Sequence, residues 1–516
     1  MVVHFPGEDA KRAAHHDAKE LFEAHGDPRA VRKALEERHG PAQGADTVHR
    51  FDEKHVGYKR EDVERNTRTL AFKETGERLA LGLGNLQLLN VLLITVIPNI
   101  LVAGVVLALR SVATGLVESG YLSFSKRFDG EKARSFWFGN ALGYSFILSS
   151  IFITLHSIAE NPLFMWLFAF SFLAVGVFGA LYLQSGLRLK GGSINKDRMS
   201  HYLKWISYYG IVIVAVVFLA AGVILDVYSE PIVITALAMP LFIYGYAILL
   251  FGTGILILVT SYLSTCLKRV RIVQEGVGTF EAYRRSIGSS LKDTLGEGSF
   301  AKSMLAAGVV FYSAQLALNY YLGIHLYEHF EAFTPVAVLF AATLFTMFVV
   351  PLFFDKRTLR LNGRSSLFLF GTGLALFIPL AFALVHTPLV RAELISLLAS
   401  AVAFPETAVD FLPMLYLLIG IAGSSIAGIA FSRLALDTMK PGVRTQFMRS
   451  LGFLTPLVSG LLILIVFSLR AFTDAALASF IALSLAFLIA IVIFASLISH
   501  RLEQRFEHQA LTPHKV

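Results

Sequence analysis

The sequence predicts an all-α polytopic membrane protein with twelve transmembrane helices in two six-helix bundles and both termini in the cytoplasm. Of the 516 residues, 55% are hydrophobic and only 16% are charged, whereas a soluble domain has about 25% charged residues. Apolar runs recur at the length of about 20 residues that a helix needs to cross a hydrocarbon core of about 30 Å. Basic residues concentrate in alternate loops, which is typical of polytopic membrane proteins.

Residues 1–78 form a charged segment that contains no apolar run long enough to cross a bilayer. Glu8, Asp9 and Lys11 lie where a secretory signal would have its apolar core, so the segment is not a signal peptide. We expect a cytoplasmic, helical N-terminal segment whose last helix begins near Lys59 and continues into the membrane. This segment is a candidate docking surface for a protein partner.

The apolar runs divide the remaining chain into twelve predicted spans. They are 79–97, 100–123, 136–156, 163–183, 205–225, 232–266, 303–324, 334–353, 366–385, 411–432, 451–469 and 476–499. The expected domains are an N-terminal bundle at 79–266, a cytoplasmic linker at 267–302, a C-terminal bundle at 303–499 and a cytoplasmic tail at 500–516. The run 232–266 is predicted to be one long helix with a cytoplasmic overhang. Two six-helix bundles joined by a linker are typical of transporters built from repeats.

The charges of the loops set the predicted orientation. The predicted cytoplasmic loops are rich in Lys and Arg, whereas the predicted outer loops carry only two basic residues, Arg391 and Arg470. The net charge of +8 is therefore a signal of topology and of contact with membrane lipid. It does not indicate a nucleic-acid partner.

The predicted turn between spans 8 and 9 carries a possible gating sequence, Pro351-Leu-Phe-Phe-Asp-Lys-Arg-Thr-Leu-Arg. It resembles the G-x-L-x-D-R/K-x-G-R/K-R/K motif of the major facilitator superfamily. Asp355, Lys356 and Arg360 match its acidic and basic positions, while Pro351 and Thr358 replace both glycines. The resemblance implies a secondary transporter of a small solute, whose two halves rock about a midplane cavity.

The equivalent turn after span 2 keeps part of the same motif. Gly120, Lys126 and Arg127 match it, but Phe124 replaces the aspartate. The adjoining Asp-Gly-Glu-Lys-Ala-Arg sequence, which ends at Arg134, also resembles the multidrug and polysaccharide exporter superfamily, which has twelve spans in two halves. Two alternatives therefore stay open: a lipid-linked polysaccharide flippase or multidrug exporter, and a non-transporting scaffold subunit, which the degenerate motifs would suit.

Arg110 is the clearest ionisable residue inside a predicted span. Such a residue costs about 2.5 to 3.5 kcal/mol on insertion scales and is a functional candidate by default. We expect it to face the bundle interior, where it binds an anionic substrate group, pairs with a carboxylate, or has a structural role toward a neighbouring helix. Glu118, two turns along the same helix, is the one carboxylate placed for proton coupling.

A polar stripe marks span 7, where Tyr312, Gln315 and Asn319 recur at i, i+3 and i+7. Lining of the substrate cavity is one interpretation, and interhelical hydrogen bonding, worth about 0.6 kcal/mol on average in membranes, is the other. Asn90 in span 1, with Gln87, is a shorter example of the same pattern.

Motifs for cofactor or metal chemistry are absent from the sequence. It has no Walker loop, nucleotide fingerprint or cysteine cluster, and Cys266 is the single cysteine. His325 and His329 have the i, i+4 spacing of a metal pair, but we expect a solvated helix end there. The sequence therefore predicts no cofactor, no metal site and no enzymatic activity.

Overall fold

The computed structural model describes residues 60–83, 86–97, 99–121, 130–159, 161–193, 196–227, 232–236, 239–243, 245–267, 280–353, 361–385, 387, 391–393, 396, 407–438, 441–473 and 476–511. The chain divides into two compact units, Met1–Arg68 and Thr69–Val516. Nearly all described elements belong to the second unit, and the packing described below is internal to it.

The described elements of the first half follow the predicted spans closely. They are α4 (Arg60–Leu83), α5 (Leu86–Val96), α6 (Ile100–Ser119), α8 (Gly130–Ala159), α9 (Pro162–Ser193), α10 (Lys196–Val227), β1 (Ile232–Ala236), β2 (Met239–Ile243) and α11 (Gly245–Thr265). The helix expected near Lys59 is confirmed as α4. The turn before α6 is closed by Asn99, whose side chain accepts hydrogen bonds from the backbone N–H groups of Leu101 and Val102.

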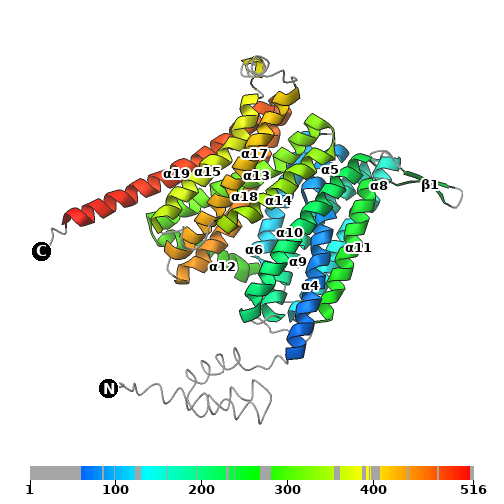
Figure 1. Ribbon diagram of the computed structural model, residues 1–516, viewed down its shortest axis with the longest axis horizontal. Coiled ribbons are helices and arrows are strands. Elements are labelled where there is room, and N and C mark those ends of the chain that lie inside the picture. The colour runs from blue at the N-terminus through cyan, green and yellow to red at the C-terminus, as the bar shows by residue number, and fades with distance from the viewer. Residues whose placement is uncertain are drawn as a thin grey trace, which may run out of the picture. The chain divides into compact units, whose positions relative to one another are not determined.

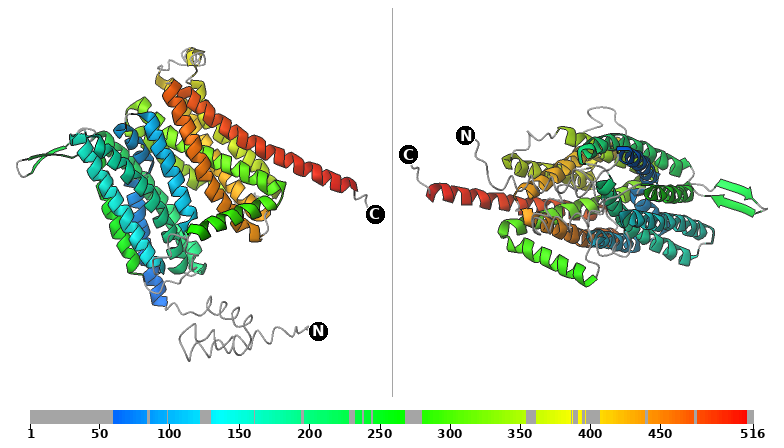
Figure 2. Two further views of the ribbon diagram at one scale, coloured as in Figure 1. Left: turned by 180° about the vertical axis from the view of Figure 1, so that it is seen from behind. Right: turned by 90° about the horizontal axis from the view of Figure 1, so that it is seen from below.

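The second half continues the same alternation of helices and short turns (Figure 1). It comprises α13 (Ser299–Phe330), α14 (Phe333–Phe353), α15 (Leu361–Val385), α17 (Thr407–Thr438), α18 (Pro441–Thr473) and α19 (Ala476–Leu511), while α12 (Phe280–Gly296) lies within the predicted linker. With 36 residues, α19 is about 54 Å long at 1.5 Å per residue. It therefore extends beyond the predicted span 476–499, as Figure 2 shows.

The protein is an integral multi-pass membrane protein. Among the described residues, eight helices are long and apolar enough to cross a bilayer, namely α6, α8, α9, α11, α13, α15, α18 and α19. Shorter apolar helical segments lie in α10, α14 and α17. On α8 the exposed side chains include Trp137, Tyr144, Leu148 and Leu155, which form an apolar face suited to lipid.

The two halves share part of their internal packing. In the first half, α8 packs against α9 and α11, and α6 packs against α9. In the second half, α15 packs against α17 and α19, and α14 packs against α17. Replacing each helix by its counterpart six spans later converts the first set of contacts into the second. This set of contacts is therefore repeated between the halves. The repeat is partial, because α13 packs against α18 and α19 while the described residues of α5 make no comparable contacts with α10 and α11.

The halves contact each other through two equivalent helix pairs. One pair is α6 with α18 and the other is α10 with α14, and α5 adds contacts to α13 and α14. In Figure 1, α4, α8 and α11 of the first half lie on the right, α15 and α19 of the second half lie on the left, and α13 and α14 lie between them.

Small residues bring α6 and α18 close together. A Cβ atom on Gly104 would lie 2.4 Å from the Phe467 side chain, and one on Gly115 would lie 1.9 Å from the Pro456 ring. The hydroxyls of Ser111 and Ser459 meet at 2.7 Å between these two contacts. The pair is therefore in close contact along its length, which small residues permit in membrane helices.

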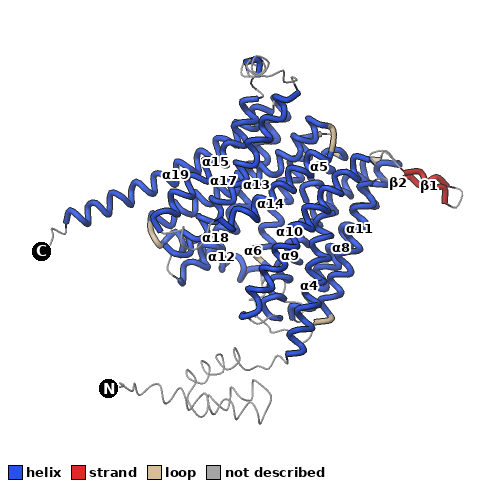
Figure 3. The backbone as a smooth tube through the Cα atoms, in the orientation of Figure 1, coloured by secondary structure: helices blue, strands red, loops and turns tan. Residues whose placement is uncertain are grey.

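One predicted span is wrong. Residues 232–266 do not form a single helix, because an antiparallel hairpin of β1 and β2 precedes α11, which begins only at Gly245 (Figure 3). The strands pair Ile232 with Ile243 and Ala236 with Met239. The backbone N–H and C=O groups of an apolar run that is rich in β-branched residues and contains a proline can be paired in a short hairpin as well as in a helix. Hydropathy alone therefore does not distinguish a helix from a hairpin here.

Replacing Gly115 by alanine should destabilise the protein by about 1 to 3 kcal/mol, because the new methyl group meets the rigid Pro456 ring. Gly252→Ala in α11 is the matched control, since no atom lies within 4 Å of its added Cβ. The measurement is thermal unfolding in detergent. Equal unfolding midpoints for both variants would contradict close packing of α6 on α18.

Candidate functional site

Arg110 lies inside the first half, with 1% of its surface exposed. Its Nη1 donates a hydrogen bond to Oδ1 of Asn90 on α5 at 2.9 Å, and its guanidinium carbon lies 4.2 Å from the centroid of the Phe172 ring on α9. Gly176 makes room for the arginine, because a Cβ there would lie 2.8 Å from its Cγ. Asn90 and Arg110, both predicted site residues, are thus brought together.

The surroundings of the Arg110 guanidinium are neutral within the described part of the chain. Asn90 and Phe172 carry no charge, and Tyr320 on α13 is close enough to interact electrostatically with the arginine. Thr114, one turn along α6, has a buried hydroxyl oxygen without a hydrogen-bond partner. Arginine, threonine and tyrosine therefore gather where the first half faces α13.

Glu118 does not join this group. Its side chain is exposed near the end of α6 and accepts a hydrogen bond from Nε2 of Gln184 at 2.8 Å. The structure therefore does not bring it together with Arg110.

The stripe on α13 is partly buried. Tyr312 donates a hydrogen bond to the carbonyl oxygen of Gly428 on α17 at 3.4 Å, and its ring contacts Phe431 edge-on. Gln315 and Asn319 are each half-buried. The Tyr312 contact lies within the second half, and the role of all three residues in lining a cavity stays a prediction.

Most of the predicted gating residues cannot be placed. Lys126, Arg127, Asp355, Lys356 and Arg360 lie outside the described residues. Gly120 follows α6 directly, and its N–H donates a hydrogen bond to the carbonyl of Leu116 at 3.0 Å.

Next to Gly120, a buried polar group joins the ends of α6 and α8. The Glu131 carboxylate accepts hydrogen bonds from the Tyr121 hydroxyl at 2.9 Å and from Nη1 of Arg134 at 2.8 Å. The carboxylate therefore has a donor from each side, the tyrosine after α6 and the arginine on α8.

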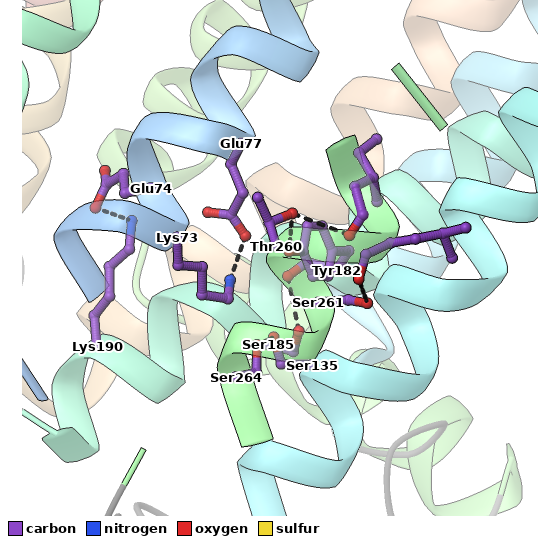
Figure 4. Close-up of polar contacts among 12 residues, drawn as sticks. Lys73, Glu74, Glu77, Ser135, Tyr182, Ser185, Lys190, Thr260, Ser261 and Ser264 are labelled. Atoms are coloured by element: carbon purple, nitrogen blue, oxygen red, sulfur yellow. Dashed lines mark hydrogen bonds and ion pairs between the residues drawn. The ribbon is translucent and has the colours of Figure 1, made fainter. Parts of the chain in front are cut away.

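A second polar group, which sequence analysis missed, joins α4 to α9 and α11 (Figure 4). Lys73 is 2% exposed, forms an ion pair with Glu77, and lies 4.7 Å from the centroid of the Tyr182 ring. Glu74 pairs with Lys190 at 3.0 Å. The only sequence signal was the i, i+4 spacing of opposite charges on one helix.

Hydroxyl groups connect the neighbouring helices in the same region. Ser135 meets Ser264 at 2.9 Å, and the Tyr182 hydroxyl meets Thr260 at 3.3 Å. These contacts satisfy polar groups that lipid could not, and they place α4 residues from Thr69 onward within the packed unit.

A carboxylate links the two halves at the junction of α10 and α14. Asp226 accepts hydrogen bonds from the backbone N–H groups of Phe333 at 2.6 Å and Thr334 at 2.8 Å, and from the Thr334 hydroxyl. Asp226 thus caps the N-terminus of a helix that belongs to the other half, where the helix dipole favours negative charge. Below it, Phe218 packs edge-on against Phe340.

His325 is not at a solvated helix end, which corrects the sequence-based expectation. Helix α13 continues to Phe330, so His325 lies inside it and is 6% exposed. Its ring packs between Phe382 of α15 and Phe480 of α19, with centroid distances of 5.6 and 5.0 Å. Across the described residues, no group of three or more His, Cys, Asp or Glu side chains could hold a metal ion.

Comparison by sequence finds no relative: no protein-family model and no curated protein matches the chain. Comparison by structure finds several transporters. An inward-facing bacterial homologue of the iron transporter ferroportin superposes with a TM-score of 0.60 at 13% identity, covering 86% of this chain and 99% of that one. The nucleoside transporter NupG gives 0.55 at 11% identity, with coverage of 84% and 98%.

A POT family transporter crystallised with a thioalcohol-conjugated peptide superposes with a TM-score of 0.54 at 13% identity, covering 85% of this chain and 96% of that one. The chain has the major facilitator fold. The resemblance suggested by the turn at Asp355 is thereby confirmed at the level of the fold. At such low identity the major facilitator fold by itself assigns no substrate.

The Glu74 ion pairs should make stability depend on pH. Burial alone disfavours the charged carboxylate, but Lys190 and Arg78 outweigh burial and hold the pKa of Glu74 below its ordinary value. A carboxyl group whose pKa is lower when folded stabilises the protein above its unfolded pKa, and this contribution is lost as the pH falls.

We therefore expect Glu74→Gln to lower the unfolding midpoint at pH 7 and the difference from wild type to shrink below about pH 4.5. Glu331→Gln, at an exposed carboxylate, is the control and should match wild type throughout. A Glu74→Gln deficit that is constant from pH 7 to pH 4 would show that the ion pairs contribute no pH-dependent stability. The measurement is thermal unfolding in detergent.

Proposed function

We propose that this protein is a secondary transporter that moves a small solute across the cell membrane by alternating access. The single observation that carries the proposal is the way the halves meet. Two equivalent helix pairs, α6 with α18 and α10 with α14, join repeated halves. Such symmetry lets one pair of surfaces close one side of a central path while the other side opens.

The proposal includes twelve spans with both termini in the cytoplasm. Eight long apolar helices and the three shorter apolar segments fall on eleven of the predicted spans. The remaining predicted span, 79–97, coincides with the end of α4 and with α5. Helix α5 has only 11 residues, fewer than a full crossing needs. The bias of basic residues toward alternate loops supports the orientation.

We further propose that the conformation described is inward-facing. Asp226 and the aromatic pair beneath it hold the halves together at the end that the charge bias assigns to the outside. The higher TM-score with the inward-facing ferroportin homologue, 0.60 against 0.50 for the outward-facing state, supports the same assignment.

Transport is tested with the purified full-length protein. A library of metabolites is first screened by thermal stabilisation, because a ligand that binds the native state raises apparent stability. Each hit is then measured for uptake into proteoliposomes. Saturable uptake supports the proposal, whereas binding without uptake, or no binding of any kind, would favour a scaffold that retains the fold.

Asp226→Asn should favour opening of the outer side. Hydrogen bonds to a charged group are worth about 1.5 to 3 kcal/mol each, and a loss of about 1.4 kcal/mol shifts an equilibrium tenfold. In a Cys266→Ser background, a cysteine is introduced by Ala337→Cys, at a buried position that faces Gly222. Its labelling by a membrane-impermeant maleimide should be about tenfold faster in Asp226→Asn.

Glu331→Gln, which removes an exposed carboxylate from the turn before α14, is the control and should label at the wild-type rate. Equal labelling of Asp226→Asn and wild type would show that this junction does not open. A rigid junction would also contradict alternating access through α10 and α14.

A further inference from the structure

The buried charge of Arg110 is poorly compensated by the protein itself. A guanidinium group has five N–H donors, yet one hydrogen bond, to Asn90, accounts for its donation to described residues. The Phe172 ring covers one face at 4.2 Å, a cation–π contact that partly offsets the loss of water around the cation. Removing an ion from water is costly unless it is paired, and no ion pair within the described residues includes Arg110.

The other buried charged side chains named above have oppositely charged partners. Lys73 and Arg134 each lie against a carboxylate, Glu77 and Glu131 respectively. Glu74 likewise has Lys190. Arg110 is as deeply buried as these residues, but the groups around it are an amide, an aromatic ring and hydroxyls. Among the described residues, Arg110 therefore has no negatively charged partner.

The groups beside Arg110 are suited to an anion. The Thr114 hydroxyl is buried without a partner, and both Thr114 and Arg110 lie against the same Gly176 of α9, each within 2.8 Å of its added Cβ. Tyr320 approaches from α13 in the second half. One hydroxyl, that of Thr114, therefore lies beside the arginine, and Tyr320 of the second half interacts with it electrostatically.

We propose that Arg110, with Thr114 and Tyr320, binds an oxyanion group, a carboxylate or a phosphate, of the transported solute. This inference rests on the proposed transport function and adds the substrate class. The planar fork of arginine matches the two oxygens of such a group and allows bidentate binding. The Phe172 ring covers one face of the guanidinium, which leaves its edge for the anion.

The test uses the full-length protein in detergent at constant ionic strength. The probes are inorganic phosphate, sulfate, acetate and succinate, each compared with chloride, and the measurement is the rise in unfolding midpoint with concentration. Wild type should show saturable stabilisation by at least one oxyanion and none by chloride. Failure of all four probes to stabilise wild type selectively would overturn the proposal.

Variants assign the binding to this site. Arg110→Gln should abolish the selective stabilisation, and Arg110→Lys should raise the half-saturating concentration at least tenfold, because a lysine ammonium cannot bind two oxygens in the same plane. Thr114→Val, which removes only the hydroxyl, should weaken binding several-fold and keeps the test open if the arginine variants fail to fold.

Arg188→Gln is the matched control. Arg188 also lies over a tyrosine ring, that of Tyr121 at 5.2 Å, and has a buried Nη1 without a partner, but it belongs to another part of the first half. It should bind the probe as wild type does. Unchanged stabilisation in Arg110→Gln and Thr114→Val, or its loss in Arg188→Gln alone, would place the anion elsewhere and refute the assignment.

The same experiment separates this inference from the proposed function. If Arg110→Gln abolishes oxyanion binding but the wild-type protein transports no solute, the binding site is supported and the transport function is rejected. Uptake of a neutral solute that is unaffected by Arg110→Gln would retain transport and reject the anionic substrate.

Discussion

The close contact between α6 and α18 is the interaction on which the rest of this structure depends. Lipid provides little hydrophobic drive for two helices to associate, so van der Waals contact and interhelical hydrogen bonds must hold them. Glycines at 104, 115 and 460 remove the side chains that would separate the two backbones. The serine pair between them adds a hydrogen bond that crosses from one half to the other.

The same helix also positions the candidate site. The residues of α6 that face α18 recur at 104, 108, 111 and 115, which is one helical face. Arg110 lies on a different face and enters the first half toward α5 and α9. Because α6 is held on one side by α18, its other side presents the arginine from a fixed backbone. Packing and chemistry thus use opposite sides of one helix.

Several buried charged groups elsewhere in the described part of the molecule are paired by short contacts. Asp226 caps α14, Glu131 accepts from two donors, and Lys73 lies between a carboxylate and an aromatic ring. Each arrangement pairs a group that would be costly to leave alone in a low-dielectric interior. Arg110 contrasts with this pattern, and that contrast distinguishes a candidate binding residue from a structural one.

Several features of the site could be predicted and others could not. The depth of Arg110 in an apolar run predicted a buried cation, and the structure places it beside Asn90, which a separate polar pattern had singled out. The burial of His325 was not predictable, because it depends on Phe382 and Phe480 from helices far along the chain. Glu118, two turns along the same helix, could be singled out as a carboxylate, but its partner, Gln184 on α9, could not be predicted.

The sequence by itself determined where most of the described helices form, because helix positions follow from local hydropathy. The distribution of basic residues adds a prediction of which loops share a side of the membrane. Only the tertiary structure decided which helices pair between the halves, that a hairpin replaces the start of one span, and which polar side chains meet. These outcomes depend on close approach between segments distant in sequence, and periodicity within one helix carries no information about the partner that its face will contact.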